Sequence, residues 1–328
     1  MQRNRASRPG VLDNVLIIAE EESPTVEPAG ARPTRRTVLT LGAGTAFAAA
    51  LPGGTAHAAT PGAGLSRQLR ELERAHAARL GVYAHDTATG RTVLYRADER
   101  FPMCSLFKTV AVAAVLRDLD RHGEFLARRV HYTADDVKKA EYAPETGKEK
   151  NLAHGMTVAE LCDAAITQSD NAAANLLLRE LGGPTAVTDF CRSTGDGVTR
   201  LDRWEPQLNS AEPDRLTDTT SPRAIGQTYA RLTLGNALVP WDRKRLTGWM
   251  LANTTSVNRF RKGLPADWAL ADKTGGGSYG TNNNAGITWP PGRPPIVLSV
   301  LTTRHEAAAA ADDELVARTA ALLAGALG

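Results

Sequence analysis

Two residues three positions apart, Ser105 and Lys108, could together form an activated nucleophile. A serine hydroxyl attacks poorly unless a base takes its proton and donors stabilise the oxyanion that forms. On a helix this spacing puts both side chains on one face. Residues 110–116 are apolar and favour a buried helix, which would lower the pKa of the lysine and leave free N–H groups at its beginning. Such a pair arises by chance about once in a chain of this length, so alone it is weak evidence.

Two tripeptides add weight to this pair. Residues 169–171 read Ser-Asp-Asn between two predicted helices, and residues 273–275 read Lys-Thr-Gly at the end of a predicted strand. Finding all three patterns by accident has a probability on the order of one in a thousand at most. Together they are the signature of class A serine β-lactamases and penicillin-binding proteins, and from about residue 64 to its end the chain resembles a class A serine β-lactamase.

The resemblance implies roles for the residues of the first two motifs. It makes Ser105 the nucleophile and Lys108 its partner in acylation. It also implies that Ser169 contacts the departing lactam nitrogen and that Asn171 contacts the substrate side chain.

The third motif is implied to bind the substrate carboxylate and the oxyanion. Lys273 would attract the carboxylate with help from Thr274, and Gly275 completes the motif. The implied oxyanion hole consists of the backbone N–H groups of Ser105 and Gly276.

Glu205 distinguishes hydrolases from related acylating proteins. D,D-peptidases share the Ser, Lys and K-T-G elements, but they release β-lactams slowly, and sensors stay acylated. A hydrolase needs a carboxylate that deprotonates water beside the acyl-enzyme. Residues 203–209 resemble the loop that supplies it, with Asn209 holding the same water. We therefore predict a β-lactamase that hydrolyses penicillins and cephalosporins, with a D,D-peptidase or a β-lactam sensor of the same superfamily as the alternative.

The same loop carries two structural predictions. Arg203 is expected to pair with Asp218 across the neck of the loop, as a structural clasp rather than a surface ion pair. The bond between Glu205 and Pro206 is a candidate cis peptide, because X–Pro bonds tolerate that isomer.

The chain departs from the family pattern at several places. Residues 278–282 contain no arginine, which relatives often carry there, so Arg259 is predicted to bind the carboxylate instead. Tyr142 matches an aromatic residue at the mouth of the family's cleft, although an ordinary half-buried tyrosine is nearly as common. Leu106 replaces the usual threonine and should alter the packing under the site.

Three cysteines, Cys104, Cys162 and Cys191, cannot be paired from sequence alone. Cys162 matches one half of a disulfide of some relatives, but Val112 stands at the partner position, so that bridge cannot form. We expect Cys104 to be packed rather than reactive.

Other kinds of chemistry are disfavoured. None of the seven histidines falls in the motifs and no pair has zinc-ligand spacing, which argues against a metal-dependent or a Ser-His-Asp hydrolase. The chain has no Walker-type phosphate loop, and its net charge of +3 is too small to indicate a nucleic-acid surface. We expect no metal, no cofactor, no nucleic-acid partner, a small-molecule β-lactam substrate and a monomer.

Strand patterns lie at both ends of the folded region, with helices between them. The two ends must therefore meet in one five-stranded antiparallel sheet flanked by helices, with an all-helical subdomain inserted: an α+β fold. The resemblance implies that the active site lies in the cleft between the two parts. The predicted strands are residues 80–86, 91–96, 268–274, 284–289 and 296–303. The predicted helices include residues 64–79, 105–121, 171–181, 222–234 and 312–327. A capping box at residues 157–160 predicts the beginning of another helix.

Residues 1–58 are predicted to be a disordered extension and a signal peptide. Arg35 and Arg36 resemble a twin-arginine motif, residues 41–51 are apolar but too short to span a membrane, and residues 56–58 offer a cleavage site. We expect residues 59–328 to be secreted or periplasmic, without stable membrane association. Within them the α/β part is expected at about 64–100 and 259–328, and the helical part at about 101–258.

Overall fold

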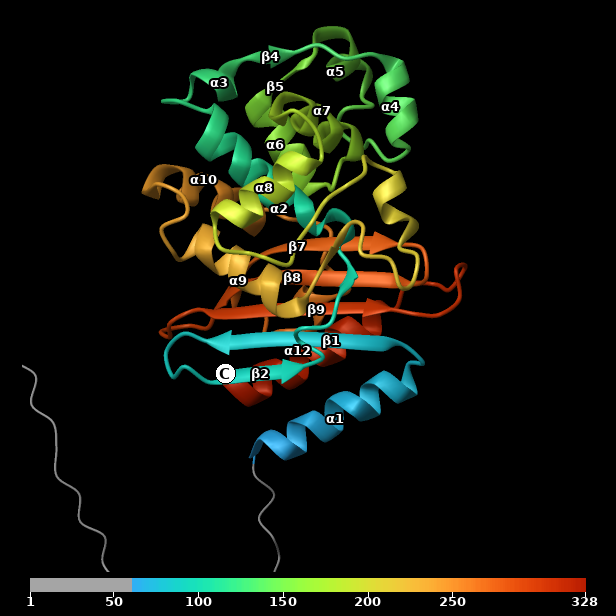
Figure 1. Ribbon diagram of the computed structural model, residues 1–328. Helices are drawn as coiled ribbons and strands as arrows, with labels where there is room; N and C mark the ends of the chain where they lie inside the picture. The colour runs from blue at the N-terminus through green and yellow to red at the C-terminus, as the bar shows by residue number, and fades with distance from the viewer. Residues whose placement is uncertain (1–60) are drawn as a thin grey trace, which may run out of the picture. The chain divides into compact units, whose positions relative to one another are not determined.

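A computed structural model describes residues 61–328, and an antiparallel sheet of five strands, in the order β2-β1-β9-β8-β7, forms its centre (Figure 1). β1 pairs with β9 from Arg79 opposite Thr303 to Asp86 opposite Ile296, so the two ends of the folded chain share one sheet, as predicted. The strands are β1 (Arg79–Asp86), β2 (Thr92–Tyr95), β7 (Ala269–Gly277), β8 (Thr281–Trp289) and β9 (Ile296–Thr303).

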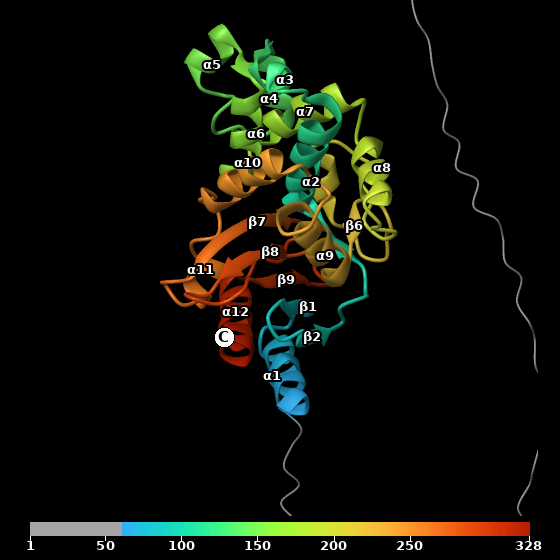
Figure 2. The ribbon, with the colours of Figure 1, turned by 90° about the vertical axis from the view of Figure 1, so that its left-hand side faces the viewer.

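Helices cover both faces of this sheet. Along β1, Val82 and Tyr83 belong to different hydrophobic clusters, because alternate residues of a strand point to opposite faces. Val82 packs with α1 (Pro61–Ala75) and α12 (Asp313–Leu327), whereas Tyr83 faces α9 (Pro222–Thr233), and Figure 2 shows α12 and α9 on opposite sides of the sheet. β1, β8 and β9 are buried on both faces for this reason, whereas the edge strand β2 is partly exposed.

The apolar run after Ser105 forms the central helix of the second part. Every residue of α2 (Phe107–Ala114) is buried, which explains its lack of a polar face. A 3-10 turn at Cys104–Leu106 precedes it and a π turn at Val115–Leu119 follows it. The helical run therefore ends at Leu119, two residues before the predicted end, and Gly123 adopts a φ of +88° at the beginning of α3.

Further helices surround α2, and several of them were not assigned from sequence. Two short strand pairs, β3 with β6 and β4 with β5, tie the loops of this part together. α9 lies within the range predicted for the helical part, yet it packs on the sheet. The remaining elements are β3 (Phe101–Pro102), α3 (Glu124–Ala127), β4 (Arg129–Val130), α4 (Ala134–Ala140), α5 (Glu149–His154), β5 (Met156–Thr157), α6 (Val158–Thr167), α7 (Asn171–Leu181), α8 (Thr185–Ser193), β6 (Thr219–Thr220), α10 (Pro240–Leu251) and α11 (Phe260–Gly263).

Local capping signals fix several helix ends. Thr157 and Glu160 form the predicted capping box of α6, and the hydroxyl of Ser221 accepts the N–H of Ala224 at the beginning of α9. Gly182, at a φ of +93°, ends α7. One boundary was wrong: Arg79 begins β1 instead of ending the first helix, which stops at Ala75.

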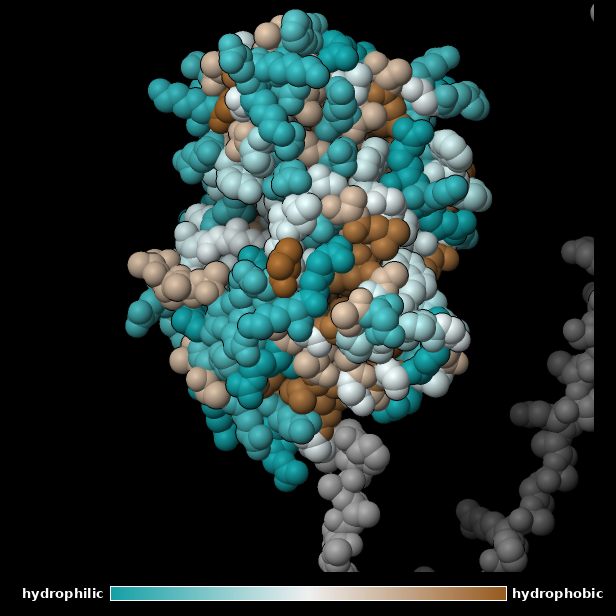
Figure 3. All heavy atoms as spheres, turned by 180° about the vertical axis from the view of Figure 1, so that it is seen from behind, coloured by the Kyte–Doolittle hydropathy of each residue, from teal (hydrophilic) through white to brown (hydrophobic). Residues whose placement is uncertain are grey.

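In the part of the chain that the structure describes, no helix combines the length and the apolar character that a membrane crossing would need. The face in Figure 3 is mostly hydrophilic, with separate hydrophobic patches. The predicted export signal and cleavage site lie outside the described residues.

Candidate active site

The three motifs meet in a cleft of about 310 Å³ between the helical part and β7. Most of the site residues predicted from sequence line this cleft: Ser105, Tyr142, Ser169, Asn171, Asn209, Arg259, Thr274, Gly275 and Gly276. The other three, Lys108, Glu205 and Lys273, are buried and contact the lining residues.

A sharp turn presents Ser105 to the cleft. Cys104 adopts a φ of +48°, a strained conformation for a residue with a side chain, and it turns the chain from β3 into the helical run. Ser105 therefore stands at the beginning of that run, where the backbone N–H groups have no hydrogen-bond acceptor within the helix. Below it, the carbonyl of Leu106 accepts a hydrogen bond of 2.7 Å from the buried Tyr229 hydroxyl.

The nucleophile, the carboxylate and the first lysine are in direct contact. The Ser105 hydroxyl donates to Glu205 Oε1 at 3.3 Å, and Lys108 Nζ lies 3.0 Å from the same oxygen. Both charged side chains are fully buried. A carboxylate that touches the serine hydroxyl is suitably placed to act as a base.

The ammonium of Lys108 has one acceptor for each of its three protons. Besides Glu205, it donates to Asn171 Oδ1 at 2.6 Å and to the Ser169 carbonyl at 2.8 Å. Burial lowers the pKa of Lys108, and the negative charge of Glu205 opposes that shift. Because an ammonium has three N–H donors, these three acceptors saturate it.

The middle residue of the second motif has a structural role. Asp170 is fully buried and caps α7 by accepting the N–H of Ala173 at 2.8 Å. It also accepts the N–H groups of Glu145 and Thr146 at 2.9 and 2.8 Å. Asp170 thus ties the loop at 145–146 to the turn that carries Ser169, a task that sequence reasoning did not assign.

The second lysine approaches the cleft from β7. Lys273 Nζ donates to Ser169 Oγ and to the Thr274 carbonyl, both at 3.0 Å. Burial and the nearby positive charge of Lys108 hold the pKa of Lys273 well below its ordinary value. Ser169 is therefore within hydrogen-bonding distance of Lys273, and Lys108 Nζ lies 3.4 Å from the same hydroxyl oxygen.

Glycines allow β7 to lie against the nucleophile turn. A Cβ on Gly275 would stand 2.9 Å from the carbonyl oxygen of Met103, and one on Gly277 would stand 2.5 Å from that of Asn209. These are closer than a Cβ normally comes to an oxygen. A Cβ on Gly276, the second residue predicted for the oxyanion hole, would make only an ordinary contact of 3.7 Å with the carbonyl oxygen of Thr281.

The loop that carries Glu205 is fixed at several points. Its Glu205–Pro206 peptide bond is cis, as predicted. The Asn209 amide donates to Glu205 Oε2, while its buried Oδ1 has no partner among the described residues. At the neck, Arg203 Nε binds Asp218 at 2.6 Å, and Asp218 is buried, so the predicted clasp is present.

Arg259 and Tyr142 lie at the edges of the cleft. Arg259 precedes α11, and it binds Asp313 through Nε at 2.7 Å and two strand carbonyls through Nη1. Its Nη2 has no hydrogen-bond partner within residues 61–328 and is available to an anion. The side chain of Tyr142 is 53% exposed, as suits a residue at the cleft mouth.

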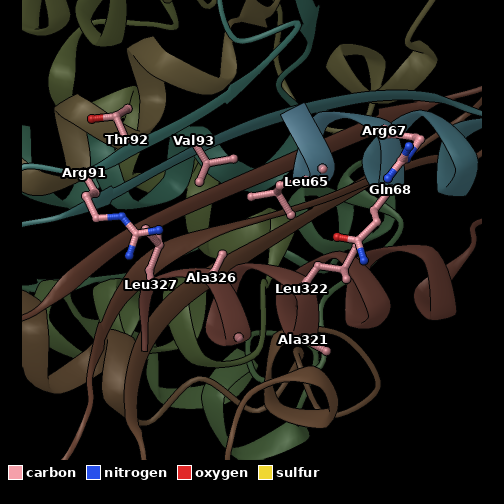
Figure 4. A pocket seen from close by; sticks show the side chains of 12 residues that line it. Leu65, Arg67, Gln68, Arg91, Thr92, Val93, Ala321, Leu322, Ala326 and Leu327 are labelled. Atoms are coloured by element: carbon pink, nitrogen blue, oxygen red, sulfur yellow. The ribbon is translucent and has the colours of Figure 1, made fainter. Parts of the chain in front are cut away.

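A larger hollow than this cleft lies elsewhere on the described part of the chain. It has a volume of about 750 Å³ and lies between α1 and α12, where Leu65, Leu322 and Ala326 face it (Figure 4). It contains none of the motif residues.

Residues 61–328 contain no cluster of three or more His, Cys, Asp or Glu side chains that could bind a metal ion.

Comparisons with known proteins identify the family of this chain. The model of the "Beta-lactamase enzyme family" matches residues 64–327. A β-lactamase of Streptomyces lavendulae is 71% identical over 301 residues, covering 91% of this chain and 99% of that protein. The carbapenem-hydrolyzing β-lactamase KPC of Klebsiella oxytoca is 47% identical over 259 residues, covering 79% of this chain and 87% of that protein. The solved structure of the β-lactamase from Streptomyces albus G, 70% identical, superposes with a TM-score of 0.80 over 81% of this chain and all of that one.

Proposed function

Because this chain belongs to the class A serine β-lactamases, we propose that Ser105 is the nucleophile with which it opens the β-lactam ring. The protein hydrolyses β-lactams and confers resistance to them. The observation that carries the proposal is the contact of 3.3 Å between the Ser105 hydroxyl and the Glu205 carboxylate.

In the acylation step, Glu205 takes the proton of Ser105. The serine oxygen then bonds to the lactam carbon, and negative charge collects on the carbonyl oxygen between the N–H groups of Ser105 and Gly276. The carbon–nitrogen bond breaks as Ser169 gives its proton to the departing nitrogen. Lys108, which lies 3.4 Å from the Ser169 hydroxyl and 3.0 Å from Glu205, returns a proton to Ser169 and takes the one that Glu205 received, so Glu205 is a carboxylate again. Lys108 acts as a charged neighbour and not as the base, because its three N–H donors are occupied by acceptors.

In the deacylation step, Glu205 activates a water molecule. Asn209 supports this role, since its amide binds Glu205 and its buried Oδ1 can accept a proton of that water. The water oxygen then bonds to the acyl carbon, the ester bond to Ser105 breaks, and Glu205 returns the proton taken from water to the Ser105 oxygen. The substrate carboxylate is bound by Lys273, Thr274 and Arg259.

We also propose that the enzyme is an exported monomer. Arg35 and Arg36, followed by the apolar residues 41–51, support export by the twin-arginine route. Replacing both arginines by lysine should keep the protein in the cytoplasm, as fractionation of the host cells would reveal. Sedimentation of the purified protein measures its molar mass, which should be that of a single chain.

The mechanism is tested by a chromogenic cephalosporin and mass spectrometry. The native protein should turn over many substrate molecules, whereas Glu205→Ala should accumulate a stable adduct on Ser105. A stable adduct on the native protein as well would show that Glu205 does not drive deacylation.

A further inference from the structure

Three side chains, Asn253, Thr255 and Thr274, link the buried carboxylate of Asp272 to the cleft. Asn253 Nδ2 lies 3.0 Å from Asp272 Oδ1, and Thr255 Oγ1 lies 2.8 Å from Asn253 Oδ1. Thr255 Oγ1 in turn lies 2.6 Å from Thr274 Oγ1. Thr255 and Thr274 both line the cleft, while Asp272 and Asn253 are buried behind it. The sequence motifs point only to Thr274.

The amide of Asn253 can have only one orientation. The backbone N–H of Thr255 lies 3.1 Å from Asn253 Oδ1, and a backbone N–H can only donate, so this atom must be the oxygen. The other amide atom faces the Asp272 carboxylate, which suits an NH₂ group. Burial raises the pKa of Asp272, but protonating it would not turn the amide, because the Thr255 N–H would remain in place.

This orientation fixes the direction of both hydroxyl groups. Asn253 Oδ1 only accepts, so the Thr255 hydroxyl donates to it. The Thr255 oxygen must then accept at its other contact, and the Thr274 hydroxyl is the donor. In this structure the Thr274 proton therefore points into the protein and away from the cleft.

A substrate carboxylate needs the opposite arrangement. A carboxylate only accepts, so Thr274 can bind it only by donating its proton to it. Unless Thr255 also turned, two oxygens without a proton between them would face each other across 2.6 Å. Thr255 is free to turn, because its own backbone N–H continues to satisfy Asn253 Oδ1.

We propose that Thr255 is a positioning residue for the substrate carboxylate, and that its hydroxyl reverses direction when the carboxylate binds. In the complex, Thr255 donates to Thr274 and Thr274 donates to the carboxylate. Two hydrogen bonds in series polarise each other, so Thr274 becomes a stronger donor. The inference rests on the proposed binding of the carboxylate by Thr274.

Neighbouring cations do not replace Thr255 in this role. Lys273 Nζ donates to the carbonyl oxygen of Thr274 and not to its hydroxyl. Arg259 Nη1 donates to the carbonyl oxygens of Gly275 and Asn283. Among the residues that the structure describes, Thr255 alone makes a hydrogen bond with Thr274 Oγ1.

The test compares a cephalosporin with its methyl ester, which lacks the carboxylate charge. Thr255→Val should lower kcat/KM for the acid about tenfold, mostly through KM, and change that for the ester less than about twofold. Thr255→Ser retains the hydroxyl and should restore the native preference. Thr254→Val is the matched control, since the Thr254 hydroxyl binds the Thr167 carbonyl at 2.9 Å and not Thr274.

Thr274→Val separates this inference from the proposed function. If Thr274→Val leaves the preference for the acid intact, Thr274 does not bind the carboxylate and both claims are wrong. If it reduces the preference while Thr255→Val leaves it unchanged or increases it, only the positioning role of Thr255 is wrong. The double variant should lose no more than Thr274→Val alone, because the two hydroxyls act in series.

Discussion

The side chain of Asn175 binds both backbone groups of Glu205. Its Nδ2 donates to the Glu205 carbonyl at 2.9 Å, and its Oδ1 accepts the Glu205 N–H at 3.0 Å. Asn175 lies in the middle of α7, the helix that begins with Asn171 of the second motif. One rigid helix thus positions both the Ser169–Asn171 turn and the carboxylate that faces Ser105.

Replacing Asn175 by alanine should misplace Glu205 and slow deacylation. A shift of the order of 1 Å in a catalytic group can reduce a rate about a hundredfold, so kcat should fall by about that factor while acyl-enzyme accumulates. Rapid quenching followed by mass spectrometry measures the fraction of acylated Ser105. Asn151→Ala is a suitable control, because Asn151 makes a similar bond of 2.9 Å to the Glu145 carbonyl, away from Glu205. Unchanged deacylation in Asn175→Ala would show that the clasp does not aim the carboxylate.

The neck of the same loop should contribute to the stability of the fold. The Asp218 carboxylate accepts the backbone N–H groups of Asp202 and Arg203 at 2.7 and 3.0 Å, besides its bond to the Arg203 side chain. Asp218→Ala removes all three bonds and should lower the free energy of unfolding by about 2–3 kcal/mol. Urea denaturation measures the loss.

The matched comparison is an exposed ion pair of the same loop. Arg215 lies 3.3 Å from Glu212, and its side chain is 58% exposed. Arg215→Ala should change the free energy of unfolding by less than about 1 kcal/mol. Equal losses in the two variants would contradict a structural role for Asp218.

The site residues that belong to short sequence motifs could be predicted from the sequence. Ser105, Lys108 and Lys273 each belong to a motif with fixed spacing, and the structure brings all three together. The strands could also be predicted, because each contains a short run of apolar residues. The ends of two strands were predicted too short. β7 continues to Gly277 and β8 begins at Thr281, because both include glycines or asparagines, which have low strand propensity.

The supporting residues could not be predicted because their partners are distant in sequence. Asn175 meets Glu205 thirty positions away, and Thr255 meets Thr274 nineteen positions away. Neither residue lies in a motif, and polar residues on a helix or a turn are common. Asp170 was inside a motif, but its bonds to residues 145–146 depend on how that loop folds back over α7.

The cysteines should be inert in the native protein. Cys104, Cys162 and Cys191 are all free and buried, and burial raises the pKa of each thiol, so the reactive thiolate does not form at neutral pH. A thiol reagent such as dithionitrobenzoate should label none of them in buffer and all three in denaturant. Rapid labelling of Cys104 in the native protein, with loss of activity, would contradict the prediction that it is only packed.

Substrate binding should weaken at alkaline pH because of Lys273. The side chain is cationic below its pKa and neutral above it, and burial together with the Lys108 charge lowers that pKa. Raising the pH through this lowered pKa removes the positive charge that attracts the substrate carboxylate, so KM should increase at a lower pH than an ordinary lysine would allow. Measuring KM between about pH 6 and pH 10 locates the change.

Lys273→Arg provides the decisive comparison, because a guanidinium stays charged throughout this range. The increase in KM at alkaline pH should disappear in this variant, even if its absolute KM differs. The methyl ester of the same cephalosporin should show no such increase with the native enzyme, since it has no carboxylate to attract. An alkaline increase that persists in Lys273→Arg, or that also affects the ester, would assign the titration to another group.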